Sequence, residues 1–192
     1  MRNASPQASR QSRSGETSDP AGFLSDVETL RARARKHIEE GAVTDDYGMN
    51  AKTAVKILND ALATELVCTL RYRQHSFVAK GINSEPIARE FLVHANEELA
   101  HADLIAKRIV QLGGAPEFNP DRLAQLSHAE YRTCDTLEAM IRENLVAERI
   151  AIESYREMVR YFAQHDPTTR AMLEGILAIE EEHADELSDL LH

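Results

Sequence analysis

Apolar residues recur every three or four positions along most of the chain, whereas no stretch alternates apolar and polar residues convincingly. A period near 3.6 residues is typical of amphipathic α-helices. The pattern therefore predicts four long helices and one short helix that precedes them. Their expected ranges are 22–40 for the short helix and about 50–80, 85–112, 135–165 and 167–190 for the long ones.

Glycines mark the ends of the long helices. Gly81 and the pair Gly113–Gly114 each follow one of them, as is usual for a residue just past a helix end. Asp135 or Thr136 is the expected N-cap of the third long helix. Residues 115–134 are expected to form a long connection. Two short connections and one long one indicate an all-α four-helix bundle with a crossover between its second and third helices.

The 192 residues suit one domain, which we divide into a tail over 1–20, an N-terminal extension with a short helix over 21–48, and the bundle over 49–192. The tail is rich in Ser, Arg and Gln and has few large apolar groups, so we expect it to be disordered. Its three arginines leave DNA binding open as a weakly supported alternative to a plain solvated tail.

Charge and cysteine content narrow the class of protein. A net charge of −10 repels nucleic acid from most of the surface and attracts cations. Two distant cysteines, Cys68 and Cys134, form no disulfide framework and fit a reducing compartment. No stretch approaches the roughly 18 apolar residues of a membrane span, and the start lacks the apolar core of a secretory signal. We therefore expect a cytoplasmic protein without a membrane partner.

Two glutamates occupy positions that should be buried. Glu65 has Ala61, Leu62, Cys68 and Thr69 one helical turn away, and Glu148 has similarly apolar neighbours. An isolated buried carboxylate costs several kcal/mol unless it is paired or bound to a metal. The alternative is that each glutamate reaches the rim or pairs with an arginine, Arg71 and Arg149 being the nearest candidates.

The phrase Glu-x-x-His-Ala-Asp occurs twice, beginning at Glu98 and at Glu180. Either pair alone has an ordinary explanation as a surface pair, but their placement is informative. Glu98 follows Glu65 by 33 residues, and Glu180 follows Glu148 by 32. In two antiparallel hairpins this offset brings four carboxylates and two imidazoles together near the middle of the bundle.

Four carboxylates packed together without cations would repel one another. Two divalent metals would resolve the conflict, and oxygen-rich ligation with one imidazole per metal suits iron or manganese better than structural zinc. The arrangement of one Glu from each of two helices and Glu-x-x-His from the other two is that of ferritin-like di-iron proteins.

The segments "ELVCTLRY", "EELAHAD", "LVAERIAIESYREM" and "EEEHADEL" resemble the bacterioferritin branch of the ferritin-like superfamily, over about residues 50–191. The N-terminal region resembles the extension of the Dps-like members of that branch. The resemblance implies a ferritin-like four-helix bundle with a di-iron (Fe2+/Fe3+) ferroxidase centre inside one subunit. It also implies that Tyr72 hydrogen-bonds a ligand or supplies an electron, a packed core tyrosine being the alternative. The implied metal ligands and catalytic residues are Glu65, Glu98, His101, Glu148, Glu180 and His183, with Glu98 and Glu180 bridging.

The sequence departs from bacterioferritins at three places. Leu99 stands where they have a haem-ligating methionine, so no haem is expected. The chain ends about ten residues after His183, without the fifth short helix of 24-subunit cages. The resemblance therefore implies a cage of 12 copies of this chain, with 24 as the alternative. Ile150 stands where thioferritins have a cysteine.

Other residues near the expected centre are weaker candidates for supporting roles around the metal ligands. Asp103 and Asp185 are candidates to hydrogen-bond the ligand histidines, since ligating imidazoles usually donate their other N–H. Glu97 should point away around its helix, towards the surface or a cavity. His94 is expected to be an ordinary core histidine, with an iron relay as the alternative.

The resulting prediction is iron storage and detoxification, in which a ferroxidase oxidises Fe(II) with O2 or H2O2 and the mineral is stored in the cage. One alternative is a non-storing di-metal redox enzyme of the peroxidase or catalase kind. Another is a DNA-protecting assembly of the Dps type. The sequence does not decide between the two oxidants.

Overall fold

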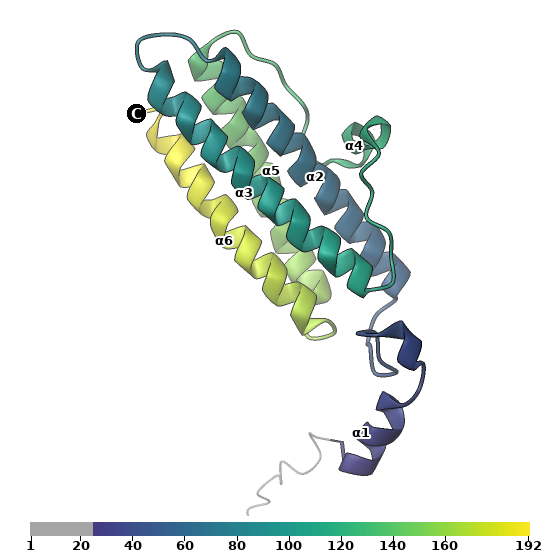
Figure 1. Ribbon diagram of the computed structural model, residues 1–192. Helices are drawn as coiled ribbons and strands as arrows, with labels where there is room; N and C mark the ends of the chain where they lie inside the picture. The colour runs from purple at the N-terminus through teal and green to yellow at the C-terminus, as the bar shows by residue number, and fades with distance from the viewer. Residues whose placement is uncertain (1–24) are drawn as a thin grey trace, which may run out of the picture.

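Residues 25–192 are described in the computed structural model, and within that range the chain is helical and contains no strand. The expected disordered tail over 1–20 lies outside the described residues. Four long helices pack as a bundle (Figure 1). They are α2 (Ala51–Val78), α3 (Ser84–Gln111), α5 (Leu137–Phe162) and α6 (Pro167–Asp189), with short elements α1 (Val27–Ala34), η2 (Ile38–Glu40) and α4 (Pro120–Leu126). The all-α fold is confirmed.

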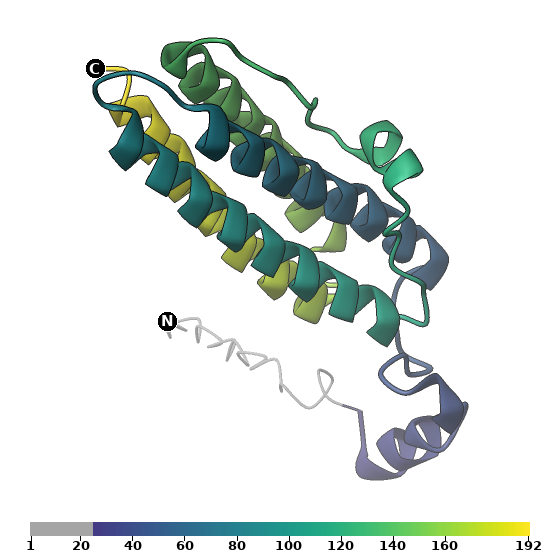
Figure 2. The ribbon, with the colours of Figure 1, turned by 45° about the horizontal axis from the view of Figure 1, so that its top comes forward.

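The bundle consists of two antiparallel hairpins. Helix α2 pairs with α3, and α5 pairs with α6, while α2 contacts α5 and α3 contacts α6 across the two hairpins. The chain then returns along the whole bundle between the end of α3 and the start of α5, so these two helices run in the same direction (Figure 2). The predicted long crossover between the second and third bundle helices is thus present.

Side chains cap the starts of the bundle helices. Asn50 accepts a hydrogen bond from the backbone N–H of Thr53 at the start of α2. Thr136, rather than Asp135, caps α5 by accepting from the N–H of Ala139. Gly113 follows α3 with a φ of 76°, a left-handed conformation that glycine adopts without strain.

The structure differs from the prediction in the segments outside the bundle. The crossover contains α4, which Asn119 caps by accepting from the N–H of Asp121, with Pro120 as the first helical residue. This start signal was present in the sequence, but the helix is too short to show a period. The predicted helix over 22–40 is interrupted within the described residues, because His37 has a φ of 47° between α1 and η2.

Two apolar clusters fill the bundle on either side of its middle. One is built around Leu58, Ile105, Phe162 and Leu173, and the other contains Phe91, Met140 and Leu187. In each long helix the polar residues predicted to be buried lie between the parts that enter these two clusters. None of the described helices has an apolar stretch long enough to span a membrane.

A buried ion pair closes one end of the bundle. Asp166, the N-cap of α6, accepts a hydrogen bond from the N–H of Thr169 and lies 2.9 Å from a guanidinium nitrogen of Arg108 on α3. The Tyr47 hydroxyl donates to the same carboxylate at 2.9 Å and so holds the N-terminal extension against the bundle. Burial alone would raise the pKa of Asp166, but bonds from Thr169, Tyr47 and Arg108 hold it below the ordinary value.

Replacing Asp166 with alanine should lower the free energy of unfolding by about 3–5 kcal/mol, because Arg108 would keep a buried charge without its partner. Since the carboxyl pKa is lowered in the folded state, this contribution is complete above about pH 4 and lost as the pH falls further. Urea unfolding of the variant at neutral and acidic pH, followed by circular dichroism, measures it. Glu138→Ala, which breaks only an exposed pair with Arg142, should cost less than about 1 kcal/mol. Equal losses in the free energy of unfolding for the two variants would contradict the role given to the buried pair of Asp166 and Arg108.

Candidate metal centre

Six carboxylates and imidazoles predicted to meet in the bundle do meet at its middle, between the two apolar clusters. Each is at most 6% exposed, and each of the four long helices contributes at least one. The heptad-like positions that place them inward are also those that pack the apolar residues, so the same helix faces build both the core and the site. The six are Glu65 on α2, Glu98 and His101 on α3, Glu148 on α5, and Glu180 and His183 on α6.

One group of donor atoms surrounds His101. Its Nδ1 lies 2.9 Å from Glu180 Oε1, 3.3 Å from Glu65 Oε2 and 3.7 Å from Glu98 Oε2. These ligand atoms all lie within 4.8 Å of one another. One cation about 2.1 Å from each donor could bind them with small side-chain movements.

A second group surrounds His183. Its Nδ1 lies 3.7 Å from Glu98 Oε1 and 4.0 Å from Glu148 Oε2, and Glu180 completes the set. Glu98 and Glu180 belong to both groups. Two adjoining cation positions that share two carboxylates are therefore available, as in di-metal carboxylate bundles.

The strongest sign of a missing counter-charge is the set of buried polar atoms without hydrogen-bond partners. Seven of the ten such atoms among the described residues belong to these six side chains, and all six are represented. A buried polar atom without a partner normally costs about 1–3 kcal/mol, and native proteins contain few of them. Their convergence fits two bound cations.

Two buried tyrosines flank the centre, and each hydrogen-bonds a glutamate on the other tyrosine's helix. Tyr72 on α2 donates its hydroxyl proton to Glu148 on α5, and Tyr155 on α5 donates to Glu65 on α2. Sequence analysis missed Tyr155, although it follows Glu148 by seven residues as Tyr72 follows Glu65. Each tyrosine occupies one oxygen of a carboxylate and leaves the other facing the centre.

The partner of His183 differs from the prediction. Glu97 Oε2 lies 2.8 Å from His183 Nε2, so this imidazole presents Nδ1 to the centre. Asp185, the candidate for this role, does not fill it, because its side chain is exposed and lines a surface groove. Asp103 is exposed as well. The contact from Glu97 crosses between α3 and α6, and helical spacing along one chain segment does not reveal such contacts.

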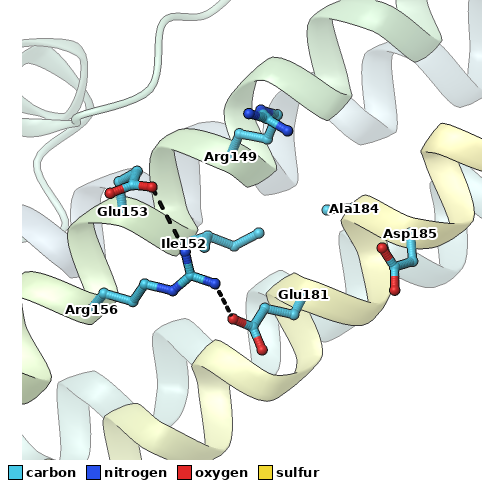
Figure 3. A pocket seen from close by; sticks show the side chains of 7 residues that line it. All are labelled: Arg149, Ile152, Glu153, Arg156, Glu181, Ala184 and Asp185. Atoms are coloured by element: carbon cyan, nitrogen blue, oxygen red, sulfur yellow. Dashed lines mark hydrogen bonds and ion pairs between the residues drawn. The ribbon is translucent and has the colours of Figure 1, made fainter.

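The arginines offered as alternative partners lie elsewhere. Arg71 is buried but donates to Asn144 Oδ1 at 3.0 Å and to the carbonyl of Glu130 at 2.9 Å. Arg149 lines a surface groove of about 380 Å³ between α5 and α6 (Figure 3). There Arg156 bridges Glu153 and Glu181, and no imidazole is present among the lining residues. Neither arginine forms an ion pair with the central glutamates.

The carboxylates influence one another strongly. Burial raises the pKa of Glu65, Glu148 and Glu180, and the negative charge of Glu98 raises each further. Burial acts in the same direction on Glu98, but the two nearby imidazoles prevail and lower its pKa. The four carboxylates therefore do not ionise together easily unless a positive charge lies between them.

The pKa values of the two imidazoles are raised, whereas burial lowers the pKa of most buried histidines. Burial alone would lower the pKa of each, but the surrounding carboxylates outweigh it. The pKa of His101 rises to about 10 and that of His183 to about 9. Both imidazoles thus carry a proton at neutral pH when no cation is present.

The four-helix fold and the six buried donor side chains resemble those of di-metal carboxylate bundles. Residues 55–192 match the family model for the ferritin-like domain, and the chain belongs to that family. It is 28% identical over 138 residues to a bacterioferritin of Mycobacterium leprae, covering 71% of this chain and 82% of the relative. It is 29% identical over 143 residues to the nutrient stress-induced DNA-binding protein of Synechococcus sp., covering 70% and 78%.

Solved structures agree with this assignment. A bacterioferritin-related dodecameric thioferritin from Bacteroides fragilis is 34% identical, with a TM-score of 0.72 and coverage of 75% of this chain and 87% of that one. Dps from Thermosynechococcus elongatus shares the fold, with a TM-score of 0.71, 18% identity and coverage of 73% and 91%. The predicted membership in the bacterioferritin and Dps-like part of the superfamily is thereby confirmed.

Metal binding to the centre should release at least about two protons per chain at pH 7, because both imidazoles must lose a proton to act as ligands. Titrating metal-free protein with Co2+ in buffers of different ionisation enthalpy measures the number by calorimetry. Because the raised pKa values keep protons on the imidazoles at lower pH, affinity should fall from pH 9 to pH 6. If the binding enthalpy is the same in every buffer, metal binding releases no protons and the prediction is contradicted.

Proposed function

We propose that this protein is an iron-storing ferroxidase whose Glu65, Glu98, His101, Glu148, Glu180 and His183 bind two Fe(II) ions as substrate. The convergence of seven unpartnered buried donor atoms from these six side chains is the observation that carries the proposal. Family membership and the bacterioferritin relatives support iron as the metal.

The donor set suits two divalent cations in charge as well as in chemistry. Four carboxylates carry four negative charges when ionised, and two divalent cations neutralise them in a site closed to bulk water. Carboxylate and imidazole donors without thiolate favour iron or manganese over a structural zinc site. The two shared glutamates, Glu98 and Glu180, would hold the ions side by side.

The protein would position the ions for a paired oxidation. Two Fe(II) ions give one electron each, so that one H2O2 and two protons yield two Fe(III) ions and two waters, or one O2 and two protons yield H2O2. The hydroxyls of Tyr72 and Tyr155 hold the two non-shared glutamates in place by donating to one oxygen of each. The apolar clusters on both sides exclude water from the pair.

Storage requires a cage, and the relatives support one. The thioferritin that is 34% identical is dodecameric, so we propose 12 copies of this chain around a cavity, with 24 as the alternative. The net charge of −10 would attract Fe(II) to the assembly. Leu99, which stands where bacterioferritins have a haem-ligating methionine, is partly exposed on α3 and has no atom that ligates haem iron.

A second candidate function is DNA protection. One relative, 29% identical, is named as a DNA-binding protein, and residues 1–20 of this chain carry three arginines. This activity is compatible with iron storage. A mobility-shift assay with and without residues 1–20 separates the two, because storage does not need the tail and DNA binding would.

Aerobic loading of the purified protein with several hundred Fe(II) per chain tests storage and oxidation together. The proposal expects a large hollow assembly that retains far more than two irons per chain, measured by size-exclusion chromatography and elemental analysis. Two irons per chain in a small oligomer would instead support the non-storing di-metal enzyme.

The variant Glu98→Ala should lose rapid Fe(II) oxidation, by about 10²-fold or more, because it removes a ligand shared by both positions. Stopped-flow absorbance in the near ultraviolet follows the initial phase, and circular dichroism checks that the helices remain. Glu153→Gln removes a charge from the exposed face of α5 and should oxidise iron at the parent rate. Parent-like oxidation by Glu98→Ala would show that the centre is assigned wrongly.

A further inference from the structure

A third group of metal-ligating side chains lies next to the centre, where α3 packs against α6. His94 is fully buried, and its Nε2 lies 2.9 Å from Glu186 Oε2 and 3.6 Å from Glu90 Oε1. The two carboxylates are 45% and 40% exposed, so the group opens to solvent. Its three donor atoms lie within 4.8 Å of one another.

The group is connected to the centre by two contacts. The ring of His94 stacks on the ring of His183, with centroids 4.0 Å apart. Its Nδ1 lies 3.2 Å from the Tyr72 hydroxyl, which in turn donates to Glu148. A continuous chain of polar groups therefore runs from the centre through Tyr72 and His94 to the surface.

The direction of these hydrogen bonds determines what His94 presents to solvent. Tyr72 has a single hydroxyl proton, and it donates that proton to Glu148. The tyrosine oxygen must then accept from His94, which places a proton on Nδ1. Nε2 of the neutral imidazole then carries a lone pair and faces the two carboxylates. Three ligand atoms that face one another with lone pairs and no proton between them suit a bound cation.

No other cation satisfies these carboxylates. Among the described residues, neither Glu90 nor Glu186 forms an ion pair with a lysine or arginine. The corresponding positions in the second hairpin also lack the group. Shifted by the 82 residues that separate Glu98 from Glu180, His94 corresponds to Ile176 and Glu90 to Met172. Glu90 and His94 are therefore particular to the first hairpin and are not part of the pattern that the two hairpins share.

We propose that Glu90, His94 and Glu186 form a third divalent-cation site, open to solvent and separate from the four-glutamate centre. Two carboxylate oxygens and one imidazole nitrogen leave room for water ligands, which suits Fe2+, Mn2+ or Co2+. The third site does not require the ferroxidase reaction. Its rival is a protonated His94 that forms an ion pair with Glu186 and binds no metal.

Anaerobic titration of the metal-free full chain with Co2+, followed by calorimetry and cobalt analysis, tests the third site. We expect three Co2+ per chain for the parent protein and two for Glu186→Gln, with Glu90→Gln binding the third ion at least tenfold more weakly. Asp185→Asn removes the same charge from the next position of α6, on a different face, and should still bind three. Only two ions in the parent protein, or three in Glu186→Gln, overturns the proposal and supports the ion pair.

The outcome is independent of the proposed function. Glu98→Ala disables the centre but leaves Glu90, His94 and Glu186 in place, so it should retain one Co2+ that is lost when Glu186→Gln is added. Anomalous scattering from a Co2+-soaked crystal should place that ion beside His94 Nε2. If this ion is present while the parent protein fails to oxidise iron, only the ferroxidase proposal fails.

Discussion

The burial of four carboxylates at one level of an apolar bundle is the constraint on which the rest of the structure depends. Leu58, Phe162 and their neighbours on one side, and Phe91 and Met140 on the other, fix the register of the four helices. That packing leaves the glutamates no route to solvent, so their charge must be neutralised in place. The two imidazoles and two tyrosines are arranged around this requirement.

The helices and the candidate centre were largely readable from the sequence because both follow from helical spacing. The distances from Glu65 to Glu98 and from Glu148 to Glu180 place the acids at equal heights in each hairpin, and the structure brings all six side chains together. Their role as ligands stays a prediction. The short helix α4 was missed because seven residues are too few to show a period.

Contacts between helices were the part that the sequence did not reveal. Glu97 was expected to face away from the centre, yet it reaches His183 on another helix, and His94 lies against the same residue. Such contacts depend on how α3 and α6 lie against each other, which no single helical pattern contains. Tyr155 is different, because its spacing from Glu148 repeats that of Tyr72 from Glu65 and would have sufficed to find it.

The two hairpins are alike at the centre and unlike just beyond it. From Tyr72 the series of polar contacts continues through His94 to exposed carboxylates, whereas Tyr155 belongs, with Ile176, to the larger apolar cluster. If the centre binds two cations as proposed, the position beside Glu148 would border a polar route to solvent, and the position beside Glu65 would border apolar side chains. Ions at the two positions should consequently differ in lability, so that a protein loaded with one metal and briefly exposed to a second would become a heterobimetallic species.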